Sequence, residues 1–243
     1  MREVYFYATC LVDLFFPDAG MAGIELLQSA GVRVIFPRGQ TCCGQPAFNC
    51  GYWEQARAVA LSQLALFPRD LPVVLPSGSC AGMMKVHYPE LFLGQPQEAE
   101  AKALAGRVFE LTQFLVDQLD LKLEDLGEPV RVTLHASCHA QRDQGVLDQP
   151  KALLRQLANV DLVPLARERE CCGFGGIFAV REPGLSEAMA RDKTEDARAS
   201  GAALVLSTDG GCLMNIGGTL EKQGFGPTTM HIAQFLRERT RVR

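Results

Sequence analysis

The sequence has little that would suit it to a membrane or to a nucleic acid. Its 243 residues contain no apolar run of about 18 residues, so no membrane-spanning helix is predicted. The net charge is −4 and no basic stripe is present, which argues against an electrostatic nucleic-acid binder. The first ten residues, MREVYFYATC, lack the apolar stretch and cleavage site of a signal peptide, so we expect a cytoplasmic protein.

Several catalytic and nucleotide-binding motifs are also missing. There is no GxxxxGK phosphate loop, no Ser/His/Asp arrangement, and no GxGxxG followed by an acidic residue at the right distance. The segment 174–176 does not meet this last pattern, so we predict neither a nicotinamide nor a flavin cofactor. Structural zinc sites usually use cysteine pairs about two to four residues apart, and these are missing too.

Nine cysteines are present, and they need an explanation. Disulfides are disfavoured in the cytosol, so metal binding or catalysis is the better explanation. The triplet Cys-Cys-Gly occurs twice, at 42–44 and at 171–173. Buried packing residues would account for scattered single cysteines, but not for two such triplets. Cys50 lies outside the pattern, and we interpret it as a packing residue.

The cysteines repeat after about half the length of the chain, which indicates a duplication. The first set is Cys10, Cys42, Cys43 and Cys80, and the second is Cys138, Cys171, Cys172 and Cys212. The offsets are 128 residues for the first cysteine, 129 for the pair and 132 for the last. The segment 110–115 likewise matches 231–236. We therefore predict two domains, 1–125 and 126–243, divided near the glycine and proline of 125–129.

Each half is predicted to alternate strands with helices. The first half has expected strands at 4–7, 32–36 and 72–75, and expected helices at 19–30, 53–67, 80–88 and within 97–121. The second half has expected strands at 130–134, 160–164 and 203–206, and expected helices at 147–158, 183–199, 212–223 and 229–239. This order predicts an α/β fold of two similar duplicated domains, each a small parallel sheet flanked by helices.

The eight patterned cysteines follow the predicted strand ends. Parallel sheets bind ligands beyond the carboxyl ends of their strands, so we expect four thiols to gather at one edge in each half. Four thiolates suit zinc or an iron–sulfur cluster. The side chains of adjacent cysteines point in different directions, so they fit poorly around one tetrahedral ion. They suit a cluster whose iron atoms each bind one thiolate. We therefore favour a cluster over zinc.

Glycines and one histidine accompany these cysteines. Gly44, Gly173, Gly175 and Gly176 are expected to let the backbone approach a cofactor and point N–H groups at sulfur. A tight turn at 173–176 is an alternative that is compatible with this role. His139, next to Cys138, is interpreted either as a hydrogen-bond or proton donor at the cofactor or as a structural histidine. The other three histidines, His87, His135 and His231, are interpreted as satisfied structural residues.

These motifs resemble those of the CCG-domain iron–sulfur proteins. The resemblance lies in Cys10 and in the segments 42–46, 77–80, 137–139, 171–176 and 211–212, and it covers nearly the whole chain. The chain is similar to the CCG domain of heterodisulfide reductase, to the iron–sulfur subunits of glycolate oxidase, and most of all to the lactate utilization protein A family.

The resemblance implies an iron–sulfur electron-transfer subunit. Such a subunit works in the cytosol with two companion subunits, one of which carries ferredoxin-type clusters. The complex oxidises L-lactate, a small 2-hydroxy acid, to pyruvate.

One departure from the family pattern bears on the type of cluster. The full CCG motif ends in Cys-x-x-Cys, but Cys80 is followed by Ala-Gly-Met and Cys212 by Leu-Met-Asn. Each copy keeps four cysteines, which is more consistent with one [4Fe-4S] cluster per copy than with a split cluster. The neighbouring Met83 and Met214 are interpreted as packing residues.

Other functions stay open at this point. The same cysteines could hold zinc in a structural or assembly module that forms a docking surface for partner subunits. The vicinal pair Cys171–Cys172 could instead serve a thiol–disulfide reductase. Glycolate or another 2-hydroxy acid would be compatible with the same residues as lactate.

Overall fold

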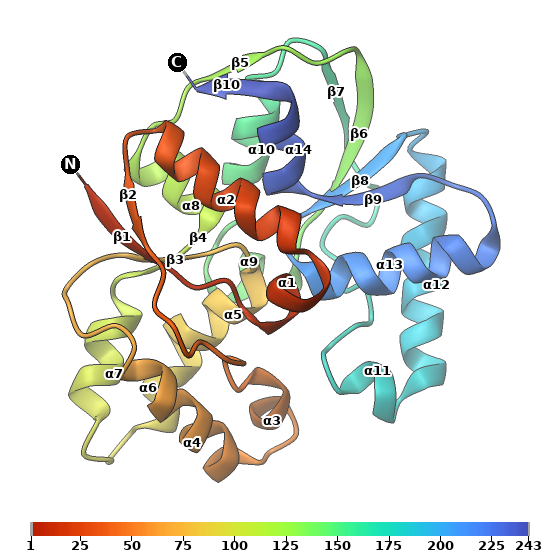
Figure 1. Ribbon diagram of the computed structural model, residues 1–243. Coiled ribbons are helices and arrows are strands. Elements are labelled where there is room, and N and C mark those ends of the chain that lie inside the picture. Colours follow the sequence, from red (N-terminus) through yellow and green to blue (C-terminus); the bar gives the residue numbers. More distant parts are fainter. Residues whose placement is uncertain (1, 243) are drawn as a thin grey trace.

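Two four-stranded parallel sheets, one in each half of the chain, form the frame of the protein (Figure 1). The computed structural model describes residues 2–242. The strand order is β2-β1-β3-β4 in the first sheet and β7-β6-β8-β9 in the second, so corresponding strands occupy corresponding places. Every pairing in both sheets is parallel. The predicted α/β fold of two similar halves is therefore confirmed.

The elements of the first half alternate as expected. Its strands are β1 (Glu3–Phe6), β2 (Arg33–Ile35), β3 (Val73–Leu75) and β4 (Val108–Glu110). Its helices are α1 (Cys10–Phe15), α2 (Pro17–Ser29), α3 (Gln45–Asn49), α4 (Trp53–Leu64), α5 (Gly78–Gly82), α6 (Tyr88–Leu91), α7 (Glu98–Ala105) and α8 (Leu111–Gln113). Two π-helical turns, η1 (Met83–His87) and η2 (Phe114–Gln118), extend α5 and α8.

The second half repeats this plan. Its strands are β6 (Val130–His135), β7 (Val160–Val163), β8 (Leu204–Ser207) and β9 (Thr228–His231). Its helices are α9 (Cys138–Asp143), α10 (Asp148–Arg155), α11 (Phe178–Arg181), α12 (Pro183–Ala199), α13 (Gly210–Gln223) and α14 (Ile232–Arg239). A small antiparallel pair joins β5 (Leu123–Asp125) to β10 (Thr240–Val242). No helix among residues 2–242 is long and apolar enough to cross a membrane.

Proline and glycine set the ends of the long helices. Pro183 begins α12, and Gly201 follows its end with a φ of 67°. Pro17 and Gly31, whose φ is 75°, play the same parts for α2. Proline is already shaped for the first helical position, and glycine adopts the left-handed conformation that ends a helix without a steric cost.

The fourth strand of each sheet differs from the sequence-based expectation. The sequence predicts helices within 97–121 and at 229–239. Instead Val108–Glu110 forms β4 and Thr228–His231 forms β9, and each strand passes directly into a helix. Strands of three or four residues are too short to show an alternating pattern, so pairing with β3 and β8 decides their conformation. The matching segments 110–115 and 231–236 thus mark a strand-to-helix junction in both halves.

The two halves pack through pairs of helices that are related by the duplication. Helix α2 packs on α14 and α10 on α8, and these helices enclose one apolar core shared by both sheets. Nearer the strand ends, α1 lies against α13 and α9 lies against α5 (Figure 1). A Cβ atom on Gly78 would lie 2.7 Å from that of Ala140, and one on Gly210 would lie 2.9 Å from the Phe16 ring. Glycine is therefore required at both crossings.

Candidate metal centres

One cavity of about 350 Å³ between the halves is lined by all eight patterned cysteines. Cys10 and Cys138 begin α1 and α9, and Cys80 and Cys212 lie in the first turns of α5 and α13. The two vicinal pairs lie in the loops after β2 and β7. The cysteines that line the cavity are Cys10, Cys42, Cys43, Cys80, Cys138, Cys171, Cys172 and Cys212. Cys50 is not among its lining residues, and Met83 is fully buried in the core of the first half.

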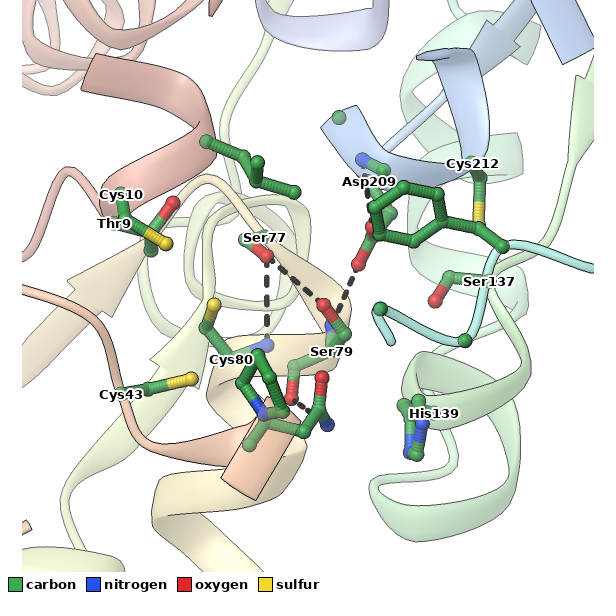
Figure 2. Close-up of a pocket in the computed structure, with 18 of the residues that line it drawn as sticks. Thr9, Cys10, Cys43, Ser77, Ser79, Cys80, Ser137, His139, Asp209 and Cys212 are labelled. Atoms are coloured by element: carbon green, nitrogen blue, oxygen red, sulfur yellow. Dashed lines mark hydrogen bonds between the residues drawn. The ribbon is translucent and has the colours of Figure 1, made fainter. Parts of the chain in front are cut away.

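The eight thiols form two sets of four, one for each half. In the first set neighbouring thiols pair in series: the Cys42 sulfur accepts from the thiols of Cys10 and Cys43, and Cys43 also pairs with Cys80. The second set repeats this series through Cys138, Cys171, Cys172 and Cys212. In Figure 2 the sulfurs of Cys10, Cys43 and Cys80 point toward one another on one side of the cavity, and Cys212 lies on the other side. All nine cysteines of the chain are free thiols.

The first member of each vicinal pair is favoured as a thiolate. Hydrogen bonds from the Cys10 and Cys43 thiols, with help from the Gly44 N–H, lower the pKa of Cys42 to about 3. Hydrogen bonds from the Cys138 and Cys172 thiols act in the same way and lower the pKa of Cys171 to about 2. A thiolate rather than a thiol is the form that binds a metal, so each set presents a ready ligand at the same position.

Glycine conformation brings backbone N–H groups to these thiolates. Gly44 and Gly173 have φ values of 89° and 85°, and their N–H groups lie 3.4 Å and 3.3 Å from the sulfurs of Cys42 and Cys171. A Cβ atom on Gly173 would also lie 2.7 Å from the Ser186 carbonyl oxygen. Gly175 and Gly176, with φ values of 52° and 63°, line the cavity beside them. The predicted glycines are thus brought together with the cysteines, and the tight turn is present as well.

A carboxylate that sequence reasoning missed lies between the two cysteine sets. Asp209 is 3% exposed, and its two oxygens accept hydrogen bonds from Gly211 N at 3.2 Å and from Ser79 N at 2.7 Å (Figure 2). It therefore holds the start of α13 and the start of α5 together across the two halves. Asp209 occupies the position that Ser77 has in the first half, and that difference was the available sequence signal.

His139 lies at the cavity in a chain of polar contacts that leads outward. It lines the cavity beside Cys138, and its Nδ1 lies 2.8 Å from the Asp143 carboxylate. The same carboxylate lies 3.9 Å from Nε2 of His87, whose Nδ1 contacts Glu90 at 2.7 Å. His139 and Asp143 come from the second half and the other two from the first, so this contact also bridges the halves. His139 thus lies beside Cys138 at the cavity, with a carboxylate that orients its ring.

His135 departs from the expectation of a satisfied structural histidine. It is 1% exposed, and neither ring nitrogen has a hydrogen-bond partner. A ring nitrogen of His135 and the sulfurs of Cys172 and Cys212 lie within 4.8 Å of one another. His87 and His231 do have partners, because His87 pairs with Glu90 and His231 Nε2 contacts the Pro76 carbonyl oxygen at 3.0 Å.

The donor set fits a soft metal or a metal–sulfur cluster. Four thiols in each half face a common space, one of them is favoured as a thiolate, and backbone N–H groups already point at that sulfur. Soft thiolate ligands select zinc, cuprous copper or iron–sulfur clusters over hard cations. The buried ring nitrogens of His135 show in addition that the second set has an unused polar group beside its sulfurs.

Comparison with known proteins finds matches to each half and to nearly the whole chain. The family model described as the cysteine-rich domain CCG matches residues 4–85 and 132–217, one match in each half. Lactate utilization protein A of Geobacillus sp. (strain WCH70) is 46% identical over 240 residues, which cover 98% of this chain and 100% of that protein. Lactate utilization protein A of Shouchella clausii (strain KSM-K16) is 45% identical over 237 residues, covering 96% and 98%.

Among solved structures, a putative Asp/Glu racemase from Yersinia pestis aligns over 98% of this chain and 96% of that one. The TM-score is 0.37 and the sequence identity is 11%. A likeness at this level carries no argument about function.

Proposed function

Because this chain belongs to the lactate utilization protein A family of cysteine-rich CCG-domain proteins, we propose that it is an iron–sulfur electron-transfer subunit of a lactate-oxidising complex. The names of its relatives support a role in lactate utilization, and its cysteines support metal binding. The proposal goes further in naming an oxidoreductase role, L-lactate as the electron source and pyruvate as the product. It places the protein in the cytoplasm, where thiols stay reduced.

The observation that carries the proposal is the arrangement of the two four-thiol sets around one cavity. Scattered structural cysteines have no reason to face a common space from corresponding positions in two halves. Two redox centres on opposite sides of one cavity could exchange electrons with each other and with a molecule or partner group that enters between them. We therefore assign one [4Fe-4S] cluster to each set.

The residues of this chain would hold and tune these centres. Cys10, Cys42, Cys43 and Cys80 would bind the first cluster, and Cys138, Cys171, Cys172 and Cys212 the second. When bound, the clusters supply one-electron redox chemistry. The Gly44 and Gly173 N–H groups would donate to sulfur, and Gly175 and Gly176 would keep the backbone close to the second cluster. His139 would present its ring as a hydrogen-bonding group at the edge of the cavity, with Asp143 orienting that ring.

The wider proposal includes two companion subunits. One would carry ferredoxin-type clusters and pass on the electrons, and the complex would take a small 2-hydroxy acid as substrate. These partners and the substrate follow from the family resemblance. The division of this chain into domains 1–125 and 126–243 belongs to the same proposal, with each domain holding one cluster.

Metal and sulfide analysis of the protein purified without oxygen tests the proposal. We expect about eight iron and eight sulfide per chain, the content of two [4Fe-4S] clusters, with a spin-resonance signal after reduction. Replacement of Cys171 by Ser should lower the iron content and the electron transfer to an acceptor, while Cys50→Ser should leave both unchanged. Stoichiometric zinc without labile sulfide would instead favour the structural module.

The same experiment addresses the thiol–disulfide alternative. That reaction would need only the vicinal pair Cys171–Cys172, so Cys138→Ser and Cys212→Ser would leave it intact. Loss of electron transfer in these two variants, together with loss of iron, would support the cluster. Retention of activity in both variants would contradict it.

A further inference from the structure

His135 stands at the position that Tyr7 has in the first half. The offset of 128 residues between them equals that between Cys10 and Cys138. His135 ends β6 and Tyr7 directly follows β1, so each comes shortly before the first cysteine of its set. Both side chains are buried, Tyr7 at 0% and His135 at 1% exposure. The two positions therefore allow a direct comparison of the two metal centres.

Tyr7 has no donor left for its cysteine set. Its hydroxyl donates a hydrogen bond to the Thr41 carbonyl oxygen at 2.7 Å, one residue before the Cys42-Cys43 pair. The phenol thus supports the loop that carries the first vicinal pair. Its one proton is already committed to the backbone.

His135 lacks such a partner. Both ring nitrogens are buried without a hydrogen bond, although a neutral imidazole always offers one N–H donor and one acceptor. His135 is not among the residues that line the cavity, so it approaches its cysteine set from the core side. The sulfurs of Cys172 and Cys212 lie within 4.8 Å of a ring nitrogen. Buried polar groups almost always have a partner, so an unpartnered imidazole beside two metal-binding thiols points to a bound acceptor.

We propose that His135 donates its ring N–H to a sulfur of the second centre and thereby gives that centre a higher reduction potential than the first. A hydrogen bond to sulfur stabilises the reduced, more negative form and so raises the potential. The backbone donors of Gly44 and Gly173 are equivalent in the two halves and cancel in this comparison. Two side-chain differences remain between the centres, His135 in place of Tyr7 and Asp209 in place of Ser77. The Asp209 carboxylate would lower the potential of the second centre, and the His135 donor outweighs it. Electrons that enter the pair are held at the second centre.

This inference rests on the proposed function, and its test uses the whole chain with its clusters assembled without oxygen. Spin-resonance redox titrations would compare the wild type with His135→Leu, His135→Gln and Tyr7→Phe. Iron and sulfide would be measured in each sample. We expect two potentials in the wild type and a decrease of the higher one in His135→Leu. The expected shift is about tenfold in the redox equilibrium, or about 59 mV for one electron.

The remaining variants separate a hydrogen bond from packing and from ligation. His135→Gln keeps an N–H donor and should retain most of the higher potential. Tyr7→Phe changes only the loop of the first set and should leave the potential of the second centre unchanged. Protein can also be prepared with ¹⁵N-labelled histidine. A weak nitrogen coupling on the spin-resonance signal of the second centre, present in the wild type and absent from His135→Leu, would support donation of the His135 N–H to sulfur. If His135→Leu perturbs folding, His135→Gln and the nitrogen coupling still test whether His135 donates a hydrogen bond to the second centre.

Three results would overturn the proposal. Unchanged potentials in fully loaded His135→Leu would remove the role of His135 and leave the electron-transfer function intact. Loss of half the iron in both His135 variants would make His135 a ligand rather than a hydrogen-bond donor. A wild type that binds zinc and no sulfide would overturn both this inference and the proposed function.

Discussion

The carboxylate of Asp209 accepts a hydrogen bond from the backbone N–H of Ser79 at 2.7 Å, across the interface between the two halves. The other oxygen of the same carboxylate accepts from Gly211 N at 3.2 Å. One buried side chain thus ties the starts of α5 and α13, the two helices that carry Cys80 and Cys212. This contact fixes the position of one cysteine set relative to the other.

Replacing Asp209 with Ala should destabilise the protein strongly. The substitution leaves two backbone donors without their acceptor, and an unsatisfied buried group costs about 1–3 kcal/mol. We expect the free energy of unfolding of the metal-free protein to fall by about 2–5 kcal/mol in urea titrations. Asp209→Asn keeps one oxygen and should show a smaller loss.

Ser77→Ala provides the matched control for Asp209. Ser77 is the corresponding residue, and its hydroxyl accepts from Cys80 N at 3.4 Å within its own half. Loss of such a helix cap costs about 0.5–2 kcal/mol. If Asp209→Ala were no more destabilising than Ser77→Ala, the bridge between the halves would contribute nothing.

Two glycines of α13 should respond in opposite directions to replacement by alanine. A Cβ atom on Gly211 would lie 2.5 Å from the Phe174 ring, which packs with Cys172 and Cys212. Gly218, on the exposed side of the same helix, has no atom within 4 Å of such a Cβ. We expect Gly211→Ala to lower the free energy of unfolding by about 1–3 kcal/mol through overpacking.

Gly218→Ala should raise that free energy by about 0.5–1 kcal/mol, because alanine favours a helix more than glycine does. Denaturant titrations of both variants would show the two signs directly. Iron content adds a second measurement, since displacement of Phe174 should reduce loading of the second centre only. Equal effects of the two substitutions would contradict the close packing of Phe174 against α13.

The strand ends that carry cysteines could be predicted because each follows an apolar run and repeats at an offset of 128 to 132 residues. The convergence of the two sets on one cavity could not be predicted in this way. It depends on α1 packing against α13 and α9 against α5, and the contact of Gly78 with Ala140 leaves no periodic signal in the sequence. Comparison of the two halves at Tyr7 and His135 was possible from sequence, but the missing partner of the imidazole appears only in the structure.

The two centres should load independently. Cys10→Ser removes a thiol from the first set and Cys138→Ser removes its counterpart from the second. We expect each variant to keep about half of the wild-type iron and sulfide, because each set contains its own four ligands. The double variant should keep almost none.

Cys50→Ser controls for the general effect of removing a thiol, since Cys50 does not line the cavity. Its iron content should equal that of the wild type. A single substitution that emptied both centres would instead indicate one shared cluster. Iron and sulfide analysis on protein prepared without oxygen distinguishes the two arrangements.

Glu110 should make the stability of the protein depend on pH. It is fully buried, and burial raises the pKa of its carboxyl from 4.5 to about 7. Between these values the folded protein holds a proton that the unfolded chain has lost. The contribution is complete below pH 4.5 and is lost as the pH rises to about 7, a decrease of about 3 kcal/mol in the free energy of unfolding.

Glu110→Gln removes the titrating carboxyl and should therefore remove its contribution to the pH dependence of the free energy of unfolding. The amide oxygen can still accept from Gln113 N, which contacts the Glu110 carboxylate at 3.1 Å. Urea titrations from pH 4.5 to pH 8 should show the variant gaining about 3 kcal/mol on the wild type as the pH rises, with no further gain above the folded-state pKa. Glu54→Gln, which changes an exposed carboxylate, controls for the loss of a charge. A difference between variant and wild type that stays constant across this range would show that the Glu110 carboxyl ionises alike in the folded and unfolded protein.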